Sequence, residues 1–180
     1  SIEKLHAMGK ESARERIQQL FDENSFVEIG AYINQKATIF NLNVKDIPAD
    51  GVITGYGTVE GRLVYAYSQD VTSLGGTIGE MHAKKIVDAY DLAIKMGAPI
   101  IALLDSEGIR LQEATDALDA VGKIFVQQSM ASGVIPQICG VLGTCGGGAS
   151  IIAGASDFTF ISKKHGQLFV NSPNTYSDTK

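Results

Sequence analysis

The stretch IIALLDSEGIR at residues 100–110 predicts a short buried β-strand over 100–104 that runs directly into a polar turn. The same plan returns in IPQICGVLGTCGGGA at residues 135–149, where a buried strand over 135–142 leads into a glycine cluster. The residues between them predict a helix over 111–131, because apolar residues recur at helical spacing: Ala114, Leu118, Val121, Ile124 and Phe125. Apolar strands that alternate with helices indicate an α/β fold with parallel strands buried on both faces.

Two capping patterns predict where helices begin in the first half of the chain. Ser12 followed by Glu15 is a capping box and predicts an amphipathic helix that ends at Asp22. Thr77 followed by Glu80 is a second capping box. It predicts a long helix that ends at about Gly97, because glycine commonly follows the last turn of a helix.

The remaining segments predict strands and loops. Residues 52–59 and 62–68 predict a β-hairpin closed by Glu60-Gly61. Residues 34–50 have the least pattern and predict a loop. The shorter predicted elements are an apolar segment over 26–29, a helix from the glycine cluster to about residue 155, and strands over 157–161 and 167–170. No repeat or linker interrupts the chain, so we predict one domain over residues 1–180.

Composition and charge restrict the class of protein. Of the 180 residues 44% are hydrophobic, so the chain can bury a sizeable core. Twenty acidic against 15 basic residues give a net charge of −5, which argues against nucleic-acid binding. No apolar run reaches the roughly 20 residues of a membrane span, and no signal peptide is visible, so we expect a cytoplasmic protein. Cys139 and Cys145 predict buried, reduced thiols and no metal site.

Two turns, at 105–110 and 143–149, carry the chemical signal. Both follow the carboxyl ends of strands, where open α/β sheets bind ligands. A glycine-rich turn that opens a helix presents unpaired backbone N–H groups, which can bind an anion or an oxyanion. The structural alternative is that glycine there only allows positive φ and close packing.

Other catalytic motifs fit poorly. Ala149 stands where a P-loop needs lysine, so a phosphate-binding loop is not supported. Leu104 stands where a nucleophile elbow at Ser106 needs glycine, which weakens a triad with His82 or His165. In the structural alternative Ser106 bonds to nearby backbone and His82 lies on its helix surface. Two further groups of side chains also suit structural roles. We predict that four lysines are solvated: Lys84, Lys85, Lys163 and Lys164. We predict that three tyrosines pack on the sheet: Tyr56, Tyr65 and Tyr67. The sequence therefore offers backbone donors and no convincing acid–base pair.

Several ordered motifs resemble those of the biotin-dependent acyl-CoA carboxyltransferases. They are SQDVTSLGG at 68–76 with GE at 79–80 and HAKKI at 82–86, then DSEGIRLQE at 105–113, ASGVIPQ at 131–137 and the turn at 143–149. ARERI at 13–17 with SFVEIG at 25–30 resembles the opening of the family. The family includes propionyl-CoA carboxylase β chains and the α chains of glutaconyl- and methylmalonyl-CoA decarboxylases. The resemblance spans about residues 12–174, and so many motifs in one order are specific.

The resemblance implies a crotonase-like (ClpP/crotonase) α/β fold of repeated β-β-α units. It also implies transfer of a carboxyl group between N1 of biotin and the α-carbon of an acyl-CoA, with biotin as the base. Backbone N–H groups would hold the thioester as an enolate. By position, the residues that would do so are Gly147 and Gly148 as the main donors, with Gly108 and Ile109 beside them. The residues expected to line the substrate site are Ser106, Gly75, Gly76 and Gly146.

The chain departs from the family in two respects. Glu107 and Ile109 replace small residues, which could narrow the acyl pocket and change the choice of substrate. Family chains also have a related C-terminal half that holds biotin, and here the match fades at Asn174. We therefore expect a partial, N-terminal domain in a homo- or hetero-oligomer. Its expected partners are an acyl-CoA, a biotinylated carrier protein and a C-terminal half or subunit.

Two alternatives keep the same fold. A crotonase-type enoyl-CoA hydratase or isomerase would need an acidic side chain at the substrate, and Glu107 and Glu113 are the nearby candidates. A half-length chain could instead act as an assembly subunit without chemistry of its own. The resemblance favours the carboxyltransferase.

Overall fold

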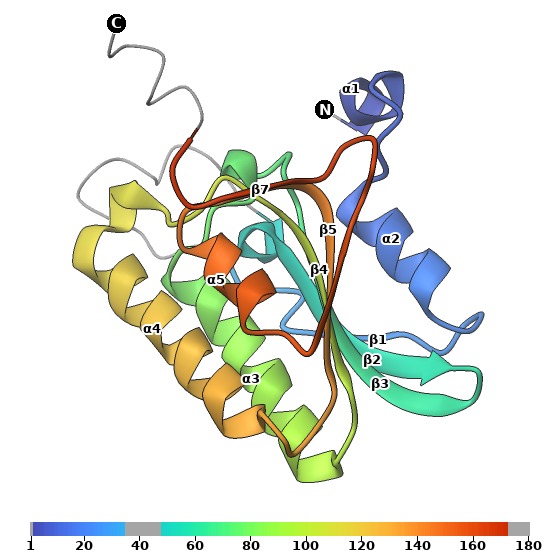
Figure 1. Cartoon of the computed structure of the whole chain (residues 1–180). Helices are drawn as coiled ribbons and strands as arrows, with labels where there is room; N and C mark the ends of the chain where they lie inside the picture. Colours follow the sequence, from blue (N-terminus) through green and yellow to red (C-terminus); the bar gives the residue numbers. More distant parts are fainter. Residues whose placement is uncertain (1, 35–47, 173–180) are drawn as a thin grey trace, which may run out of the picture.

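Seven strands form one sheet in the computed structural model, which describes residues 2–34 and 48–172 (Figure 1). Six strands lie in the order β1-β2-β3-β4-β5-β6, and β7 also pairs with β5. The strands are β1 (Val27–Ile29), β2 (Val52–Val59), β3 (Arg62–Gln69), β4 (Ile100–Ser106), β5 (Gln137–Gly146), β6 (Phe158–Ile161) and β7 (Gln167–Phe169). β1, β2 and β3 pair antiparallel, whereas β3, β4, β5 and β6 run parallel, so the predicted α/β class is confirmed.

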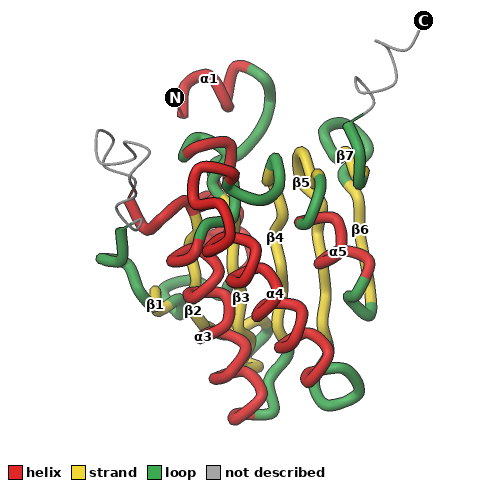
Figure 2. The backbone as a smooth tube through the Cα atoms, turned by 90° about the vertical axis from the view of Figure 1, so that its left-hand side faces the viewer, coloured by secondary structure: helices red, strands yellow, loops and turns green. Residues whose placement is uncertain are grey.

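Helices cover both faces of this sheet. Figure 1 shows α3, α4 and α5 on one face and α2 on the other, and Figure 2 shows α3 and α4 in front of the strands. The helices are α1 (Ile2–Ala7), α2 (Ala13–Leu20), α3 (Glu80–Met96), α4 (Ala114–Ala131) and α5 (Ala149–Gly154). Short 3₁₀ turns lie at 48–51, 74–76 and 111–113. Of the helices within the described ranges, none has the length and apolarity that crossing a membrane requires.

The predicted hairpin is confirmed. β2 and β3 pair along their whole length. The turn residues Glu60 and Gly61 have φ of 50° and 75°, and positive φ at both positions is what a two-residue hairpin turn of type I′ requires. The Asp22 carboxylate accepts the N–H groups of both turn residues, at 3.0 and 2.9 Å, and so ties the hairpin to the segment after α2.

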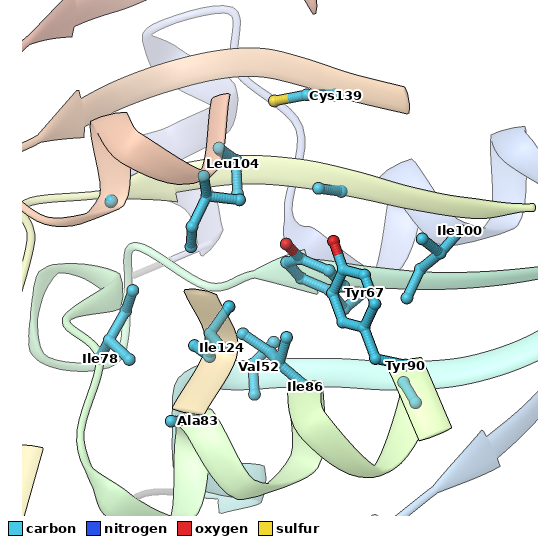
Figure 3. Packing of buried hydrophobic residues seen from close by; sticks show 14 of the residues in the cluster. Val52, Tyr67, Ile78, Ala83, Ile86, Tyr90, Ile100, Leu104, Ile124 and Cys139 are labelled. Carbon is cyan, nitrogen blue, oxygen red and sulfur yellow. The ribbon is translucent and has the colours of Figure 1, made fainter. Parts of the chain in front are cut away.

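Apolar cores lie on both faces of the sheet. Figure 3 shows Ile86 and Tyr90 of α3 packed towards Tyr67 and Ile100 of the sheet. A smaller core joins α2 to the opposite face. β4 is therefore covered on both sides, as predicted, whereas β5 alternates between buried and half-buried residues along most of its length, so one of its faces is only partly covered. The prediction of sheet packing for the tyrosines also holds, because the rings of Tyr56 and Tyr65 lie 5.5 Å apart.

β6 contradicts the prediction that the parallel strands are buried. All four of its residues are exposed, and Phe158 and Phe160 have relative exposures of 62% and 66%. The physical reason is its place at the end of the main sheet. The neighbouring helix, α5, has six residues and packs on β5.

Helix boundaries test the capping predictions. Ser12 and Glu15 form the predicted capping box at the start of α2. The second prediction is wrong, because α3 begins after Gly79 and Thr77 lies outside it. The carboxylate of Glu113 accepts the N–H of Glu80 at 2.6 Å and replaces the predicted cap with a non-local one. β5 also runs to Gly146, four residues past its predicted end at 142.

The predicted loop over 34–50 falls largely outside the described residues. Its described end, at 48–51, is a 3₁₀ turn. Ala49 and Asp50 have left-handed φ of 55° and 48° there, a conformation that side chains other than glycine seldom adopt. This turn brings Asp50 into the interior, where it has no exposed surface.

The two thiols provide a first test of this core. Cys139 and Cys145 are fully buried and free, as predicted, and burial raises the pKa of each to about 12. Because the thiolate is the reactive form, we expect neither to react with iodoacetamide at pH 8 in the folded protein. Mass spectrometry of the two peptides measures this, with protein in urea as the reactive control. Labelling of either thiol before unfolding would contradict the structure.

Candidate functional site

The two predicted turns meet at the carboxyl ends of β4 and β5. Ser106 pairs with Cys145 at the end of the parallel ladder, so the segments that follow begin side by side. Gly108 has φ of 119°, and a Cβ on it would lie 3.0 Å from the carbonyl oxygen of Gly146. Only glycine allows the two backbones to approach so closely.

A third segment, residues 74–79, fixes the turn after β4 from the other side. Ile78 donates its N–H to the carbonyl of Gly108 at 2.8 Å and accepts the N–H of Arg110 at 2.9 Å. This is a parallel β-bridge between Ile78 and Ile109. In such a bridge the N–H of Ile109 itself points away from Ile78. The segment therefore sets the direction of this N–H group.

Gly75 and Gly76 belong to this third segment. Together with Leu74 they form three successive left-handed residues, with φ of 47° to 65°. A side chain on Gly76 would collide with the backbone carbonyl of Asp105, and the carbonyl of Gly75 accepts the N–H of Glu107 at 3.0 Å. Close packing therefore accounts for Gly76, and the left-handed φ of 64° accounts for Gly75.

The N–H groups of the glycine cluster differ in their partners. Gly147 donates its N–H to the carbonyl of Phe169 in β7 at 3.1 Å. Gly148 has φ of −60° and immediately precedes α5, and a Cβ on it would lie 2.9 Å from Cδ1 of Ile109. Within residues 2–34 and 48–172, the N–H groups of Gly148 and Ile109 have no protein acceptor. Both residues are half-buried, so these donors are open to a ligand.

A buried carboxylate stands at the start of the turn after β4. Asp105 has no exposed surface, and its carboxylate lies 2.9 Å from the Arg16 guanidinium and 3.2 Å from the Lys10 ammonium. It also accepts the N–H of Thr144 at 3.1 Å. A Cβ on Gly143 would collide with this carboxylate. The cluster ties α2 and the end of β5 to the turn.

A buried arginine stands at the other end of the same turn. Arg110 is fully buried, and its guanidinium contacts the carboxylates of Asp50 at 2.5 Å and Glu113 at 2.8 Å. It also donates to the carbonyl of Thr77 at 2.9 Å. Burial raises the pKa of Asp50, and the Arg110 charge opposes that shift.

Comparisons with known proteins identify the family. Residues 4–179 match the family model described as the carboxyl transferase domain. The chain belongs to this family. It is 51% identical over 172 residues to the methylmalonyl-CoA decarboxylase subunit alpha of Veillonella parvula, and 44% identical over 173 residues to the propionyl-CoA carboxylase beta chain of Roseobacter denitrificans. Each match covers 96% of this chain and 34% of the relative, so the chain spans about a third of these relatives' length.

A solved structure agrees with this assignment. The transcarboxylase 12S structure, described as a hexamer assembly with hydrolyzed methylmalonyl-coenzyme A bound, superposes with a TM-score of 0.95. It is 41% identical in sequence, and the match covers 99% of this chain and 35% of that one. The carboxyl transferase domain described here therefore has the predicted crotonase-like fold.

Two predicted site residues have other partners in this domain. Ser106 is fully buried and its hydroxyl accepts the N–H of Gly108 at 3.1 Å. This fits the structural alternative, in which Ser106 bonds to nearby backbone; its role at the substrate stays a prediction. The N–H of Gly147 is engaged with β7, so we retain Gly148 and not Gly147 as the candidate donor from this cluster.

Two surface predictions on α3 are wrong. His82 has no exposed surface, and Lys85 is 1% exposed. Lys85 donates to the carbonyls of Ala49 and Val52, and burial lowers its pKa to about 8. His82 contacts the carbonyl of Asp50 through Nδ1 at 2.9 Å. The 48–52 segment covers this face of α3, which the helical pattern alone did not reveal.

Sequence reasoning missed the two ion clusters of the carboxyl transferase domain. Asp105 and Arg110 are the first and last residues of the predicted turn at 105–110, and charged residues directly after a buried strand were the available signal. Asp50 gave no signal, because it lies in the unpatterned segment. Among residues 2–34 and 48–172, no three His, Cys, Asp or Glu side chains are grouped as metal ligands.

His82 predicts how stability depends on pH. Burial, followed by the nearby Arg110 charge, lowers its pKa from 6.5 to about 3. Below pH 6.5 the unfolded chain therefore binds a proton that the folded protein does not. The free energy of unfolding should fall as the pH decreases from 6.5 towards 3, by up to about 1.4 kcal/mol per pH unit from this residue.

The variant His82→Asn tests this, because its amide can still donate to the Asp50 carbonyl but does not titrate. We expect urea denaturation between pH 6.5 and 5 to show a shallower loss of stability for the variant than for wild type. His6→Asn is measured as a separate comparison, since the His6 side chain is 50% exposed but pairs with Glu15 at 2.9 Å. Equal slopes for all three proteins would show that His82 does not cause the loss.

Proposed function

We propose that this chain is the acyl-CoA-binding part of a biotin-dependent carboxyltransferase, acting in a carboxylase or a decarboxylase. The proposed reaction moves a carboxyl group between N1 of biotin and the α-carbon of an acyl-CoA. The observation that supports it most is that Ile109 and Gly148, whose N–H groups have no acceptor in the described residues, lie beside each other after adjacent strands. The relatives' names support an acyl-CoA substrate of the propionyl or methylmalonyl class.

The two donors would act on the thioester carbonyl. When the α-carbon loses its proton or its carboxyl group, negative charge develops on the thioester oxygen. Backbone N–H groups that are already fixed in place stabilise that oxyanion more than they stabilise the neutral carbonyl. The bridge to Ile78 fixes Ile109, and the start of α5 fixes Gly148.

Among residues 2–34 and 48–172, two of the side chains that could act as a base near these donors are held by other partners. Glu113 is 5% exposed and its carboxylate is held by Arg110 and the N–H of Glu80. His82 is buried and contacts Asp50 and Gln69. In the proposed reaction, biotin on a partner protein supplies the carboxyl group and the base. This disfavours the hydratase alternative, for which only Glu107 remains exposed.

Partners are part of the proposal. A biotinylated carrier and a C-terminal half or subunit would complete the site in an oligomer of the intact protein. The exposed apolar side chains of β6 and β7 support such a partner, among them Phe158, Phe160, Ile161 and Leu168. We also propose a cytoplasmic location.

The test uses the intact protein that contains this chain, together with its biotinylated partner. Calorimetry with propionyl- and methylmalonyl-CoA measures binding, and α-proton exchange of propionyl-CoA in D₂O measures enolate formation. We expect binding of at least one acyl-CoA and biotin-dependent carboxyl transfer. Absence of both would overturn the proposal. Hydration of an enoyl-CoA that is lost in Glu107→Ala would instead favour the hydratase.

A further inference from the structure

Arg110 joins three separate segments around the turn that carries Ile109. It follows Ile109 directly and is fully buried. Its guanidinium contacts Asp50 from the 48–51 turn, Thr77 from the 74–79 segment, and Glu113 from the turn before α4. Its backbone N–H meets Ile78. One side chain therefore connects every element that borders this turn on the Ile78 side.

Arg110 lies on the same side of the β-bridge as Ile109 and bonds to the segment on the other side. The guanidinium donates through Nη2 to the Thr77 carbonyl at 2.9 Å and through Nε to the Thr77 hydroxyl at 3.4 Å. Thr77 immediately precedes Ile78, which pairs with Ile109. Backbone and side chain of Arg110 thus hold the same neighbouring segment. A shift of that segment would turn the Ile109 N–H.

Two anions face this one cation. Asp50 and Glu113 are both buried, and their carboxylates also accept the N–H groups of His82 and Glu80 at the start of α3. A planar guanidinium can meet several acceptors in fixed directions, which an ammonium group cannot. The bonds of Arg110 therefore do more than neutralise buried charge, because they also fix the positions of the segments that carry its acceptors.

From these contacts we propose that Arg110 is a positioning residue for the oxyanion donor Ile109. It acts by locking the 74–79 segment against the 107–110 turn, so that the Ile109 N–H keeps its direction during enolate formation. It does not touch substrate. This inference rests on the proposed function. It predicts a loss in the rate of enolate formation with little change in acyl-CoA binding.

Arg110→Lys in the intact protein, assayed together with its biotinylated partner, tests this, because it keeps the positive charge but loses the multiple directed bonds. We expect kcat for α-proton exchange of propionyl-CoA to fall at least about 10-fold, while KM changes less than about 2-fold. Hydrogen exchange of a peptide spanning 106–111 should become faster. Ile124→Val is the control, because Ile124 is fully buried in α4 and its truncation lowers stability without altering the turn.

Each result decides a different question. If Arg110→Lys does not fold, Arg110→Gln with Glu113→Gln removes one charge of each sign and is measured in the same way. An unchanged kcat in a folded variant overturns the inference, as does an equal loss of kcat in Ile124→Val at matched melting temperature. If wild type neither binds acyl-CoA nor exchanges its α-proton, the proposed function fails and not the role of Arg110.

Discussion

Replacing Gly148 with proline should lower the rate of α-proton exchange by about 100- to 1000-fold, which corresponds to about 2.7–4 kcal/mol of transition-state stabilisation. Proline removes the N–H that we propose as an oxyanion donor. Gly148 has φ of −60°, close to the value that the proline ring imposes, so proline can be placed there without a change of φ. The exchange of propionyl-CoA in D₂O, measured on the intact protein with its partners, reports the effect.

The control must separate the lost donor from crowding. A Cβ at position 148 would lie 2.9 Å from Cδ1 of Ile109, so alanine and proline both press on that side chain. A Cβ there would lie equally close to Cγ1 of Ile109, and Ile109→Ala removes both carbons. The comparison is therefore Gly148→Ala against Gly148→Pro in an Ile109→Ala background. Alanine retains the N–H and should exchange far faster than proline. Equal rates in two proteins with the wild-type melting temperature would exclude Gly148 as a donor.

Asp105→Asn should lower the free energy of unfolding by about 3–5 kcal/mol, the typical cost of removing one partner of a buried ion pair. The variant keeps the shape of the side chain, so no cavity forms. It leaves the Arg16 guanidinium, whose side chain is 4% exposed, without its counter-charge. Urea denaturation of the intact protein measures the loss.

The control for Asp105 is an exposed pair. Asp119 and Lys123 lie 2.7 Å apart on α4, and their side chains are 68% and 65% exposed. Water screens such a pair, so Asp119→Asn should leave the unfolding curve unchanged. If Asp105→Asn also unfolds like wild type, the Asp105 cluster does not hold α2 to the turn.

Local patterns in the sequence predicted most of the fold. Alternation between apolar strands and amphipathic helices located β4, α4 and β5, and the Glu60-Gly61 turn located the hairpin. These signals depend on residues that are neighbours in the chain. The errors came from distant contacts: the Glu113 cap on α3, the covering of His82 by residues 48–52 and the exposure of β6. Neither helical periodicity nor apolar composition contains that information.

In the candidate site, too, the sequence predicted some features, while those that depend on distant contacts could not be predicted. Topology placed the turns after β4 and β5 together, because parallel neighbours end at one edge of the sheet. Which N–H groups remain open could not be predicted. Gly147 is engaged by Phe169 in β7, and Ile109 is oriented by Ile78, and both partners are far away along the chain. The resemblance gave the positions of the glycines but not whether their N–H groups already have an acceptor in the protein.

The bridge between Ile78 and Ile109 also has a consequence for the order of folding. α3 and β4 lie between its two residues in the chain, so closing it costs more loop-closure entropy than closing a hairpin. The β2–β3 hairpin needs only a two-residue turn and can form early. We therefore expect the Ile109 donor to take its direction among the last steps of folding. A chain halted before that step would have the hairpin and the helices while still lacking the donor pair.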